Sequence, residues 1–279
     1  MSGFSADWLA LREPVDHRSV SPLVRDAVRK WIGPRKQIDI IDLGCGSGSN
    51  LRGFAPYLPS AQRWRLVDWD QALLDRARSA IAEWAEASES SAGSLVVRAT
   101  GKEINVSFEQ ADLMKDYARV LDKPAGLVTA AAFFDLVSVQ WIADFCEALA
   151  KRRLPLYTVL TYNGEEEWTP AHAHDAAMLA AFHAHQQSDK GFGPAAGPGA
   201  IETLRKALEA RNYTVITDES PWRMDRDDAR LIAELAAGTA QAAVESGQVS
   251  ESAAAEWLAA RRNAETCRIG HVDLFARPN

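Results

Sequence analysis

The segment 38–50, IDIIDLGCGSGSN, constrains the fold more than any other part of this sequence. Its first six residues include three isoleucines and predict a buried strand, because they are too few and too β-branched to form a helix of their own. Asp42 lies near the end of this run. Glycine then occupies every second position, at Gly44, Gly46 and Gly48. Such glycines permit a tight turn and let a ligand approach the backbone closely, so the segment predicts a strand followed by a binding turn.

Strands and helical patterns alternate along most of the chain. The runs that predict strands are 38–43, 63–70, 106–113, 125–137, 154–162, 213–220 and 270–277, with a surface turn in the Ser/Gly-rich stretch 88–94. Amphipathic stretches follow most of these runs, and a sheet built in this way is largely parallel, with helices on both faces. We therefore expect an α/β fold with a seven-stranded, mostly parallel, doubly wound sheet of the Rossmann-like kind.

Three stretches depart from the alternation. Residues 1–36 predict N-terminal helices, with a break at Pro14 among charged residues and a second helix that starts at Ser21 and stops at Gly33. Residues 163–200 and 223–262 are insertions that follow sheet strands at the same end of the sheet. We interpret the whole chain, 1–279, as a single domain in which the two insertions form a helical cap or lid.

Composition narrows the classes of partner and compartment. A chain of 279 residues with 47% hydrophobic residues can bury one large core. Its net charge of −7 and its lack of a basic stripe argue against nucleic acid. No run of 18 apolar residues occurs, and the N-terminus lacks the pattern of a signal peptide. We therefore expect a cytoplasmic protein that binds neither nucleic acid nor membrane.

Cysteine and histidine positions do not predict a metal site. Cys45, Cys146 and Cys267 are far apart in the sequence and are expected to be reduced thiols. Four histidines, at positions 172, 174, 183 and 185, lie close together in the sequence. If their segment is one helix, the pairs that share a face are separated by about 16 Å along its axis. No four-ligand site forms from such a helix, so we expect no metal.

The acidic residue before the glycines distinguishes two classes of ligand. Dinucleotide-binding turns follow the pattern G-x-G-x-x-G, in which a pyrophosphate faces a helix N-terminus. Here the last two glycines are one residue closer, and Asp42 precedes them. A carboxylate at this place repels a pyrophosphate and attracts an ammonium group. The polarity therefore favours a ligand with a zwitterionic amino-acid part and a ribose nearby.

With these features, the sequence resembles class I S-adenosylmethionine-dependent methyltransferases, whose motif I matches Asp42-x-Gly44-x-Gly46-x-Gly48. The resemblance places Asp68 on both ribose hydroxyls and Trp69 beside the adenine. It makes Asp112, in the triplet 111–113, an acceptor for the adenine amino group, although capping a helix is the alternative role of an aspartate there. The cofactor-binding residues that it implies are Asp42, Gly44, Cys45, Gly46, Gly48, Asp68, Trp69, Asp112, Leu113 and Ala130. For Cys45, simple packing of a small residue is the alternative.

The methyl acceptor is expected beyond the ends of the fourth and fifth strands, where ligands of such sheets lie. Two insertions over these ends favour an enclosed pocket and hence a small molecule, with a protein acceptor as the alternative. Residues expected to contact the acceptor are Arg12, Phe133 and Lys190, and candidates for a general base are Asp135, Tyr162 and His185. Core packing is the alternative role for Phe133, and an interior pairing is the alternative for Asp135.

The function predicted from these features is methyl transfer from S-adenosylmethionine to a small molecule. The sulfonium is already activated, so such an enzyme mainly supplies alignment and desolvation. Two other classes stay open at this point. One is a dinucleotide-dependent oxidoreductase, which the glycine spacing disfavours, and the other is a cofactor-binding protein without catalytic turnover.

Overall fold

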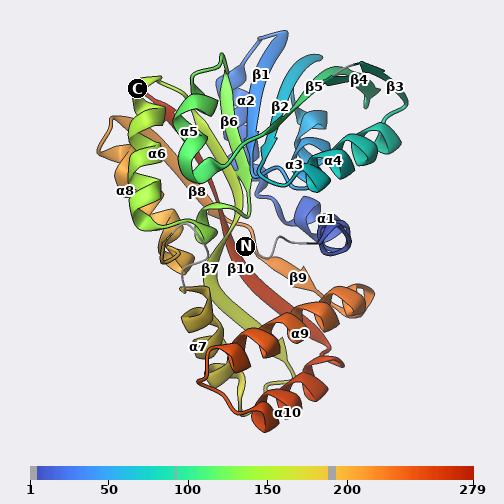
Figure 1. Ribbon diagram of the computed structural model, residues 1–279, viewed down its shortest axis with the longest axis vertical. Coiled ribbons are helices and arrows are strands. Elements are labelled where there is room, and N and C mark those ends of the chain that lie inside the picture. Colours follow the sequence, from blue (N-terminus) through green and yellow to red (C-terminus); the bar gives the residue numbers. More distant parts are fainter. Residues whose placement is uncertain (1–4, 92, 188–192) are drawn as a thin grey trace.

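The computed structural model describes residues 5–91, 93–187 and 193–279, and their strands form one mixed sheet (Figure 1). In this part of the chain the sheet has ten strands. Nine of them follow the order β3-β4-β5-β2-β1-β6-β7-β10-β8, and β9 pairs with β10. The strands are β1 Gln37–Leu43, β2 Ala61–Asp68, β3 Ala87–Ser91, β4 Ser94–Ala99, β5 Lys102–Gln110, β6 Leu127–Ala131, β7 Leu156–Thr169, β8 Tyr213–Glu219, β9 Trp222–Met224 and β10 Thr266–Pro278.

A parallel core lies at the centre of this sheet. Strands β5, β2, β1, β6 and β7 pair in parallel, and β10 runs antiparallel to both of its long neighbours, β7 and β8. The helices are α1 Ala6–Ser19, α2 Pro22–Ile32, α3 Ser49–Phe54, α4 Gln71–Trp84, α5 Leu113–Leu121, α6 Val139–Lys151, α7 Asp175–Gln186, α8 Ala200–Glu209, α9 Ala229–Glu245 and α10 Glu251–Arg261. The predicted α/β class is confirmed.

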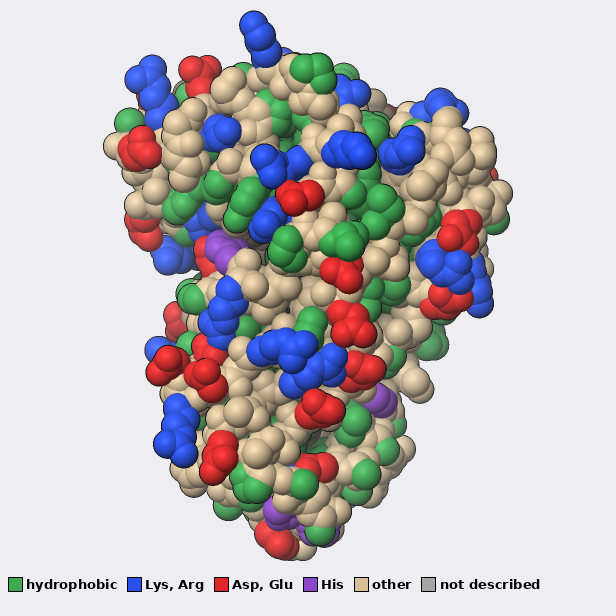
Figure 2. Space-filling model, turned by 180° about the vertical axis from the view of Figure 1, so that it is seen from behind, with side chains coloured by type: hydrophobic (Ala, Val, Ile, Leu, Met, Phe, Trp, Pro, Cys, Tyr) green, Lys and Arg blue, Asp and Glu red, His purple; other side chains and the backbone are tan. Residues whose placement is uncertain are grey.

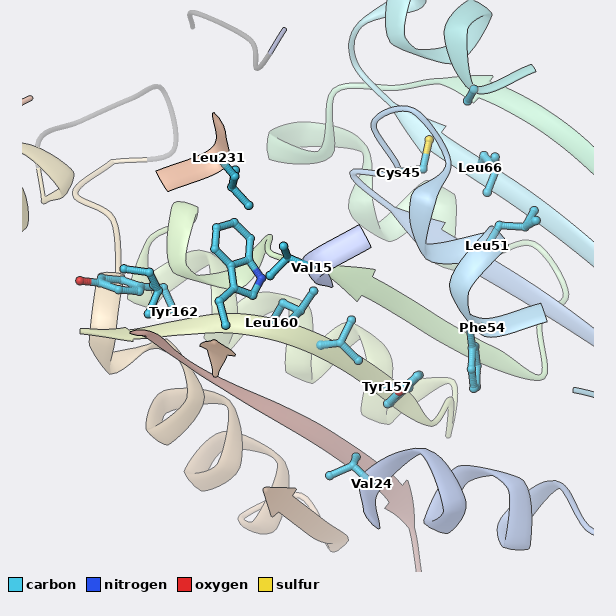
Figure 3. Close-up of a cluster of buried hydrophobic side chains, with 14 of the residues drawn as sticks. Val15, Val24, Cys45, Leu51, Phe54, Leu66, Tyr157, Leu160, Tyr162 and Leu231 are labelled. Atoms are coloured by element: carbon cyan, nitrogen blue, oxygen red, sulfur yellow. The ribbon is translucent and has the colours of Figure 1, made fainter. Parts of the chain in front are cut away.

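Two hydrophobic clusters cover the two faces of the sheet. Ile40 of β1 belongs to the cluster that includes Leu51 of α3, while Ile41, one residue later, belongs to the cluster that includes Phe145 of α6. Figure 3 shows side chains of the first cluster between the sheet and the N-terminal helices. Successive strand residues point to opposite faces, so a strand buried on both sides must be apolar almost throughout. Among the described residues, no helix has the length and apolar character needed to cross a bilayer.

The predicted number of seven strands is wrong, mainly because of a hairpin at the sheet edge. Residues 88–94 were expected to form a surface turn. Instead, β3 pairs with β4 from Ala87 opposite Arg98 to Ser91 opposite Ser94, and β4 pairs with β5. Every residue of β3 is exposed. A strand that buries neither face has no alternation of apolar and polar residues, so its sequence reads as a loop.

The N-terminal helices lie close to the expected positions, with one correction. Ser21 caps α2 and Gly33 ends it, as predicted. Helix α1, in contrast, is not broken at Pro14 and continues to Ser19. Arg12 donates two hydrogen bonds to Asp16 across the proline turn, at 2.9 and 3.1 Å, and Asp16 is itself buried. These contacts tie the residues on either side of the proline into one helix.

The two long strands carry the inserted helices away from the parallel core. β7 was expected to end at Tyr162 but continues to Thr169, because β10 pairs with it along this extension. Figure 1 shows α7, α9 and α10 gathered around the outer ends of β7 and β10. α9 packs on both α7 and α10. We call these three helices the outer helices.

Candidate functional site

A cavity of about 920 Å³ lies at the carboxyl ends of the central parallel strands. This volume is at the upper end of the range for small-molecule sites. Eleven of the predicted site residues line this one cavity: Arg12, Asp42, Gly44, Cys45, Gly46, Asp68, Trp69, Asp112, Leu113, Phe133 and His185. These residues come from segments far apart in the sequence, so the fold brings most of the predicted site residues together in one place.

The turn after β1 brings the backbone to the cavity wall. Gly44 and Gly46 have φ angles of +61° and +51°, a region that favours glycine. A Cβ atom at Gly44 would lie 2.7 Å from the ring of Phe133. Gly48 is instead the N-cap of α3, facing α4 rather than the cavity. Close approach of a ligand to this turn therefore depends on the first two glycines.

Asp42 presents a buried carboxylate to the cavity. Asn50 donates to its Oδ1 atom at 2.7 Å, but Oδ2 has no hydrogen-bond partner among the described residues. Burial raises the pKa of Asp42 to about 7, and the neighbouring Asp68 adds to the rise while the Asn50 hydrogen bond opposes it. A buried acceptor without a partner is costly. A cationic donor that reaches this atom from the cavity would offset that cost.

Asp68 stands at the end of β2, held by backbone donors. Gly46 donates its N–H to Oδ2 at 2.9 Å, and Asp70 donates to Oδ1 at 3.0 Å. Asp70 caps α4, so Asp68 is not needed for that role. Each carboxylate oxygen accepts more than one hydrogen bond, so Asp68 keeps acceptor capacity for ligand hydroxyls.

The opposite wall contains an aromatic ring and a capping aspartate. Trp69 is 44% exposed at the cavity. Asp112 accepts from the N–H of Met114 at 3.0 Å and caps α5, so the capping role considered for it is real. Its carboxylate also pairs with Lys115 at 3.2 Å, and the residue still lines the cavity.

Helix α1 closes the cavity on the N-terminal side. Leu9, Arg12, Asp16 and His17 of this helix line it. His17 Nε2 lies 3.0 Å from both the carbonyl oxygen and the hydroxyl of Ser49, which joins α1 to the start of α3. Arg12 was expected to contact the acceptor, and within the chain it forms an ion pair with Asp16. The first helix is therefore part of the site and not a distant attachment.

Four predicted site residues do not line the cavity. Gly48 caps α3, and Ala130 is buried inside β6. Asp135 is buried outside the cavity wall, where Gln186 donates to it at 3.4 Å. Tyr162 is buried between strand and helix, with its hydroxyl 3.1 Å from Glu166 and 3.0 Å from His183. Lys190 lies outside the described residues.

Tyr162 lies away from the cavity because β7 is longer than predicted. The strand was expected to end at Tyr162, but it continues past this residue, and the Tyr162 hydroxyl faces Glu166 and α7. Burial raises the pKa of Tyr162 far above its usual range, and Glu166 and Asp135 add to this. Its phenol therefore stays protonated at neutral pH.

Several residues that line the cavity were missed. Asn50, Arg25 and Tyr157 belong to it, as does Asp16. Asn50 follows the glycine turn by two residues and holds Asp42, so its position in the motif was an available signal. Tyr157 sits inside an apolar strand and Arg25 on an ordinary amphipathic helix, and neither pattern differs from that of a structural residue.

Metal-binding groups are not assembled in this part of the molecule. Within residues 5–91, 93–187 and 193–279, no three His, Cys, Asp or Glu side chains are placed to hold a metal ion. The three cysteines are free and buried. His172 and His174 precede α7 rather than sharing its faces, and His185 pairs with Glu245 at 3.0 Å.

Known structures share this architecture. A cyclopropane-fatty-acyl-phospholipid synthase-like protein from Lactobacillus casei is 13% identical, with a TM-score of 0.54 over 98% of this chain and 94% of that chain. A cyclopropane synthase from Mycobacterium tuberculosis is 14% identical, with a TM-score of 0.50 over 98% and 95%. A candidate methyltransferase from Bacillus halodurans is 13% identical, with a TM-score of 0.50 over 91% and 99%. No family model and no curated protein sequence matches the chain.

These likenesses establish the fold and extend over nearly the whole chain. Together with the order of the parallel strands and the glycine turn after β1, they show that the protein has the class I S-adenosylmethionine-dependent methyltransferase fold. The resemblance of the glycine motif is thus confirmed at the level of the fold.

Proposed function

We propose that this protein transfers a methyl group from S-adenosylmethionine to a small-molecule acceptor. The observation that carries the proposal is the buried Oδ2 atom of Asp42, a residue that lines the cavity beside the glycine turn; this atom has no hydrogen-bond partner in the described part of the chain. A carboxylate in this state fits an ammonium group, because a charged donor offsets the cost of its burial. The amino-acid end of S-adenosylmethionine supplies such a group.

The other cavity residues fit the remaining parts of this cofactor. Asp68 would accept from the ribose hydroxyls, since one carboxylate can receive two donors. Trp69 offers a flat apolar surface to the adenine, and Asp112 an acceptor for its amino group. Gly44 and Gly46 let the backbone approach the ligand without a side chain between them. When bound, the cofactor supplies an activated methyl group.

In this proposal the protein contributes alignment and exclusion of water. Phe133 and Leu136 line the cavity, and Leu9 of α1 covers the glycine turn from the other side. An apolar enclosure strengthens electrostatic contacts within it and keeps water from the reacting atoms. His185 is the predicted base candidate that lines the cavity, so its position supports this role for an acceptor that must lose a proton.

We also propose that the chain is a single domain in which residues 163–200 and 223–262 form a lid. One contact supports this role. His185 of α7 and Glu245 of α9 both line the cavity and form an ion pair. Elements that cover a site must open for exchange of ligands, and outer helices tied to the core through two long strands can do so.

Calorimetric titration of the purified chain with S-adenosylhomocysteine tests the proposed cofactor. We expect saturable binding by the wild type and much weaker binding by Asp42→Asn, with wild-type affinity retained in Asp75→Asn, an exposed residue of α4. A labelled methyl donor incubated with a panel of small molecules then tests turnover. Tighter binding of NADH than of S-adenosylhomocysteine would reverse the proposal in favour of an oxidoreductase.

A further inference from the structure

The cavity extends beyond the residues assigned to the cofactor. On the side of α2 and β7 it is lined by Val20, Arg25, Phe54, Tyr157, Val159 and Leu160. Four of these are apolar and two carry polar groups. None was predicted to contact the cofactor. This second part of the cavity, which we call the α2 branch, is where a second ligand would be held.

Strand register places the α2 branch relative to Asp42. Asp42 of β1 pairs with Thr129 of β6, and Thr129 pairs with Tyr157 of β7. Residues paired in this way point to the same face of a sheet, and neighbouring strands lie about 4.8 Å apart. Tyr157 therefore stands about 10 Å from Asp42 across two strand spacings. Two strand spacings thus separate Tyr157 from the residue proposed to hold the ammonium group of the cofactor.

The hydroxyl of Tyr157 has no hydrogen-bond partner in the described part of the molecule, although its ring is buried against Phe54 with 4.7 Å between centroids (Figure 3). Burial raises the pKa of Tyr157 well above its usual value, Asp273 adds to the rise, and the Arg25 guanidinium opposes it. The phenol thus keeps its proton and offers an O–H donor to the cavity.

Among the described residues, the side chain of Arg25 has no acidic partner. Its guanidinium makes no ion pair and no hydrogen bond with any of them, its Nε is buried, and its Cζ lies 3.9 Å from the centroid of the Tyr57 ring. The other cations that line the cavity have partners: Arg12 holds Asp16, and His185 pairs with Glu245. A guanidinium that lacks an acidic partner is suited to bidentate binding of an anion.

We propose that the methyl acceptor is a small molecule with an apolar body and a monovalent carboxylate, which Arg25 and Tyr157 bind in the α2 branch. This inference rests on the proposed function. Guanidinium and phenol are both donors, and the walls between them are apolar. The cavity also contains Asp16, Asp42, Asp68, Asp112 and Glu245, whose charges disfavour a dianion such as a phosphate monoester.

Competing probes in the presence of saturating S-adenosylhomocysteine test this assignment. Phenylacetate and hexanoate are compared with their uncharged amides and with phenyl phosphate, and binding is followed by calorimetry or ligand-observed NMR. We expect each carboxylate to bind about tenfold or more tightly than its amide, as a hydrogen bond to a charged group implies. Arg25→Gln should abolish this preference, and Tyr157→Phe should reduce it. Arg29→Gln, an exposed residue of the same helix, should keep it.

Four results would overturn the assignment. The first is that the wild type binds carboxylates and amides equally, or binds neither, and the second is that it binds phenyl phosphate more tightly than the carboxylates. The third is that Arg25→Gln keeps the preference for carboxylates. The fourth is that Arg25→Gln loses affinity for S-adenosylhomocysteine, which would assign Arg25 to the cofactor. Failure of the wild type to bind S-adenosylhomocysteine contradicts the proposed function instead. The preference for carboxylate over amide is then measured without it.

Discussion

Asp273 of β10 accepts the backbone N–H of Leu160 of β7, with 2.8 Å between Oδ1 and the nitrogen. Val272 pairs with Thr161 and Leu274 with Thr158, so two residues of β7 oppose Asp273 alone. This is a β-bulge, a feature that redirects side chains. Leu160 lies at φ +57° and lines the cavity. A buried carboxylate therefore holds a strained backbone position at the wall of the site.

Asp273→Asn is expected to lower the free energy of unfolding by about 1–3 kcal/mol, the cost of an unsatisfied buried group. Oδ1 also accepts from Ser220, and Oδ2 accepts the N–H of Ser21 at 2.7 Å. In Asp273→Asn, one of the two oxygens is replaced by an amide NH2 group. Either the N–H of Leu160 or the N–H of Ser21 then faces a donor in place of an acceptor. Urea unfolding measures the effect, with Asp75→Asn as an exposed control. An unchanged midpoint and slope in Asp273→Asn would show that the bulge needs no carboxylate.

The affinity for S-adenosylhomocysteine is expected to rise with pH between about 6 and 7. The raised pKa of Asp42, about 7, means that this carboxyl is largely protonated below that pH in the free protein. Binding of an ammonium requires the ionised form, so affinity falls as pH decreases, approaching tenfold per unit below the pKa. Titrations at several pH values check the slope. Asp42→Asn should bind weakly with no slope, and a wild-type affinity independent of pH in this range would separate Asp42 from the cofactor.

The same raised pKa gives Asp42 an effect on the stability of the free protein. A carboxyl whose pKa is higher in the folded state costs that state stability as pH rises from the ordinary pKa of about 3.9 towards about 7, and the full penalty remains above that pH. Asp42→Asn should therefore unfold at a higher temperature than the wild type at pH 8, by about 2 °C or more. This difference should shrink at pH 5. A site residue that costs stability is expected where function requires a buried charge.

Asp68→Ala is expected to weaken cofactor binding by about 1.5–3 kcal/mol, the range for hydrogen bonds to a charged group. The fold should survive, because the residue lies at a strand end and its partners within the chain are two backbone N–H groups. Calorimetry measures the loss, and circular dichroism checks the fold. An affinity equal to that of Asp75→Ala would remove Asp68 from the site.

Local patterns in the sequence predicted the parallel core and its binding turn. The glycine turn, the helix start at Ser21 and the apolar strands depend on residues close in sequence, and the structure agrees with them. Strand β3 was missed because a fully exposed edge strand leaves no alternation. Pro14 by itself predicts a helix break, because the contact between Arg12 and Asp16 that spans it depends on the burial of that helix.

Residues at the acceptor side were harder to predict, because long-range pairing decides where they lie. The local pattern predicts that the strand ends at Tyr162, but the antiparallel partner β10 extends it by seven residues to Thr169 and turns Tyr162 toward α7. The pattern around Tyr157 is that of a core residue in an apolar strand. Tyr157 lies on the same row across the sheet as Asp42 because of how β6 pairs with β1 and with β7. No local sequence pattern contains this register.

Gly46→Val is expected to abolish binding of S-adenosylhomocysteine. Gly46 has φ +51°, and a Cβ there would lie 3.0 Å from Leu9 of α1, so a branched side chain enters the space beside the turn. Gly247→Val provides the matched control, because that glycine also has positive φ but nothing within 4 Å of its Cβ position. The control should lose stability and retain binding. Normal binding by Gly46→Val would reduce the turn to a tight connection.

Backbone amides of the outer helices are expected to exchange faster than those of β1 and β6 in the free protein. α7, α9 and α10 pack mainly on one another and on the extensions of β7 and β10, whereas β1 and β6 are buried at the centre of the sheet. A lid belongs to the less stable part of a fold, because it must open for ligand exchange.

S-Adenosylhomocysteine together with a bound carboxylate probe should slow hydrogen exchange at the ends of α7 and α9, where His185 meets Glu245, and in residues 193–198. Hydrogen exchange followed by mass spectrometry measures both effects. Equal protection of the outer helices and the central strands, with and without ligands, would make these helices fixed additions to the fold and favour a larger acceptor.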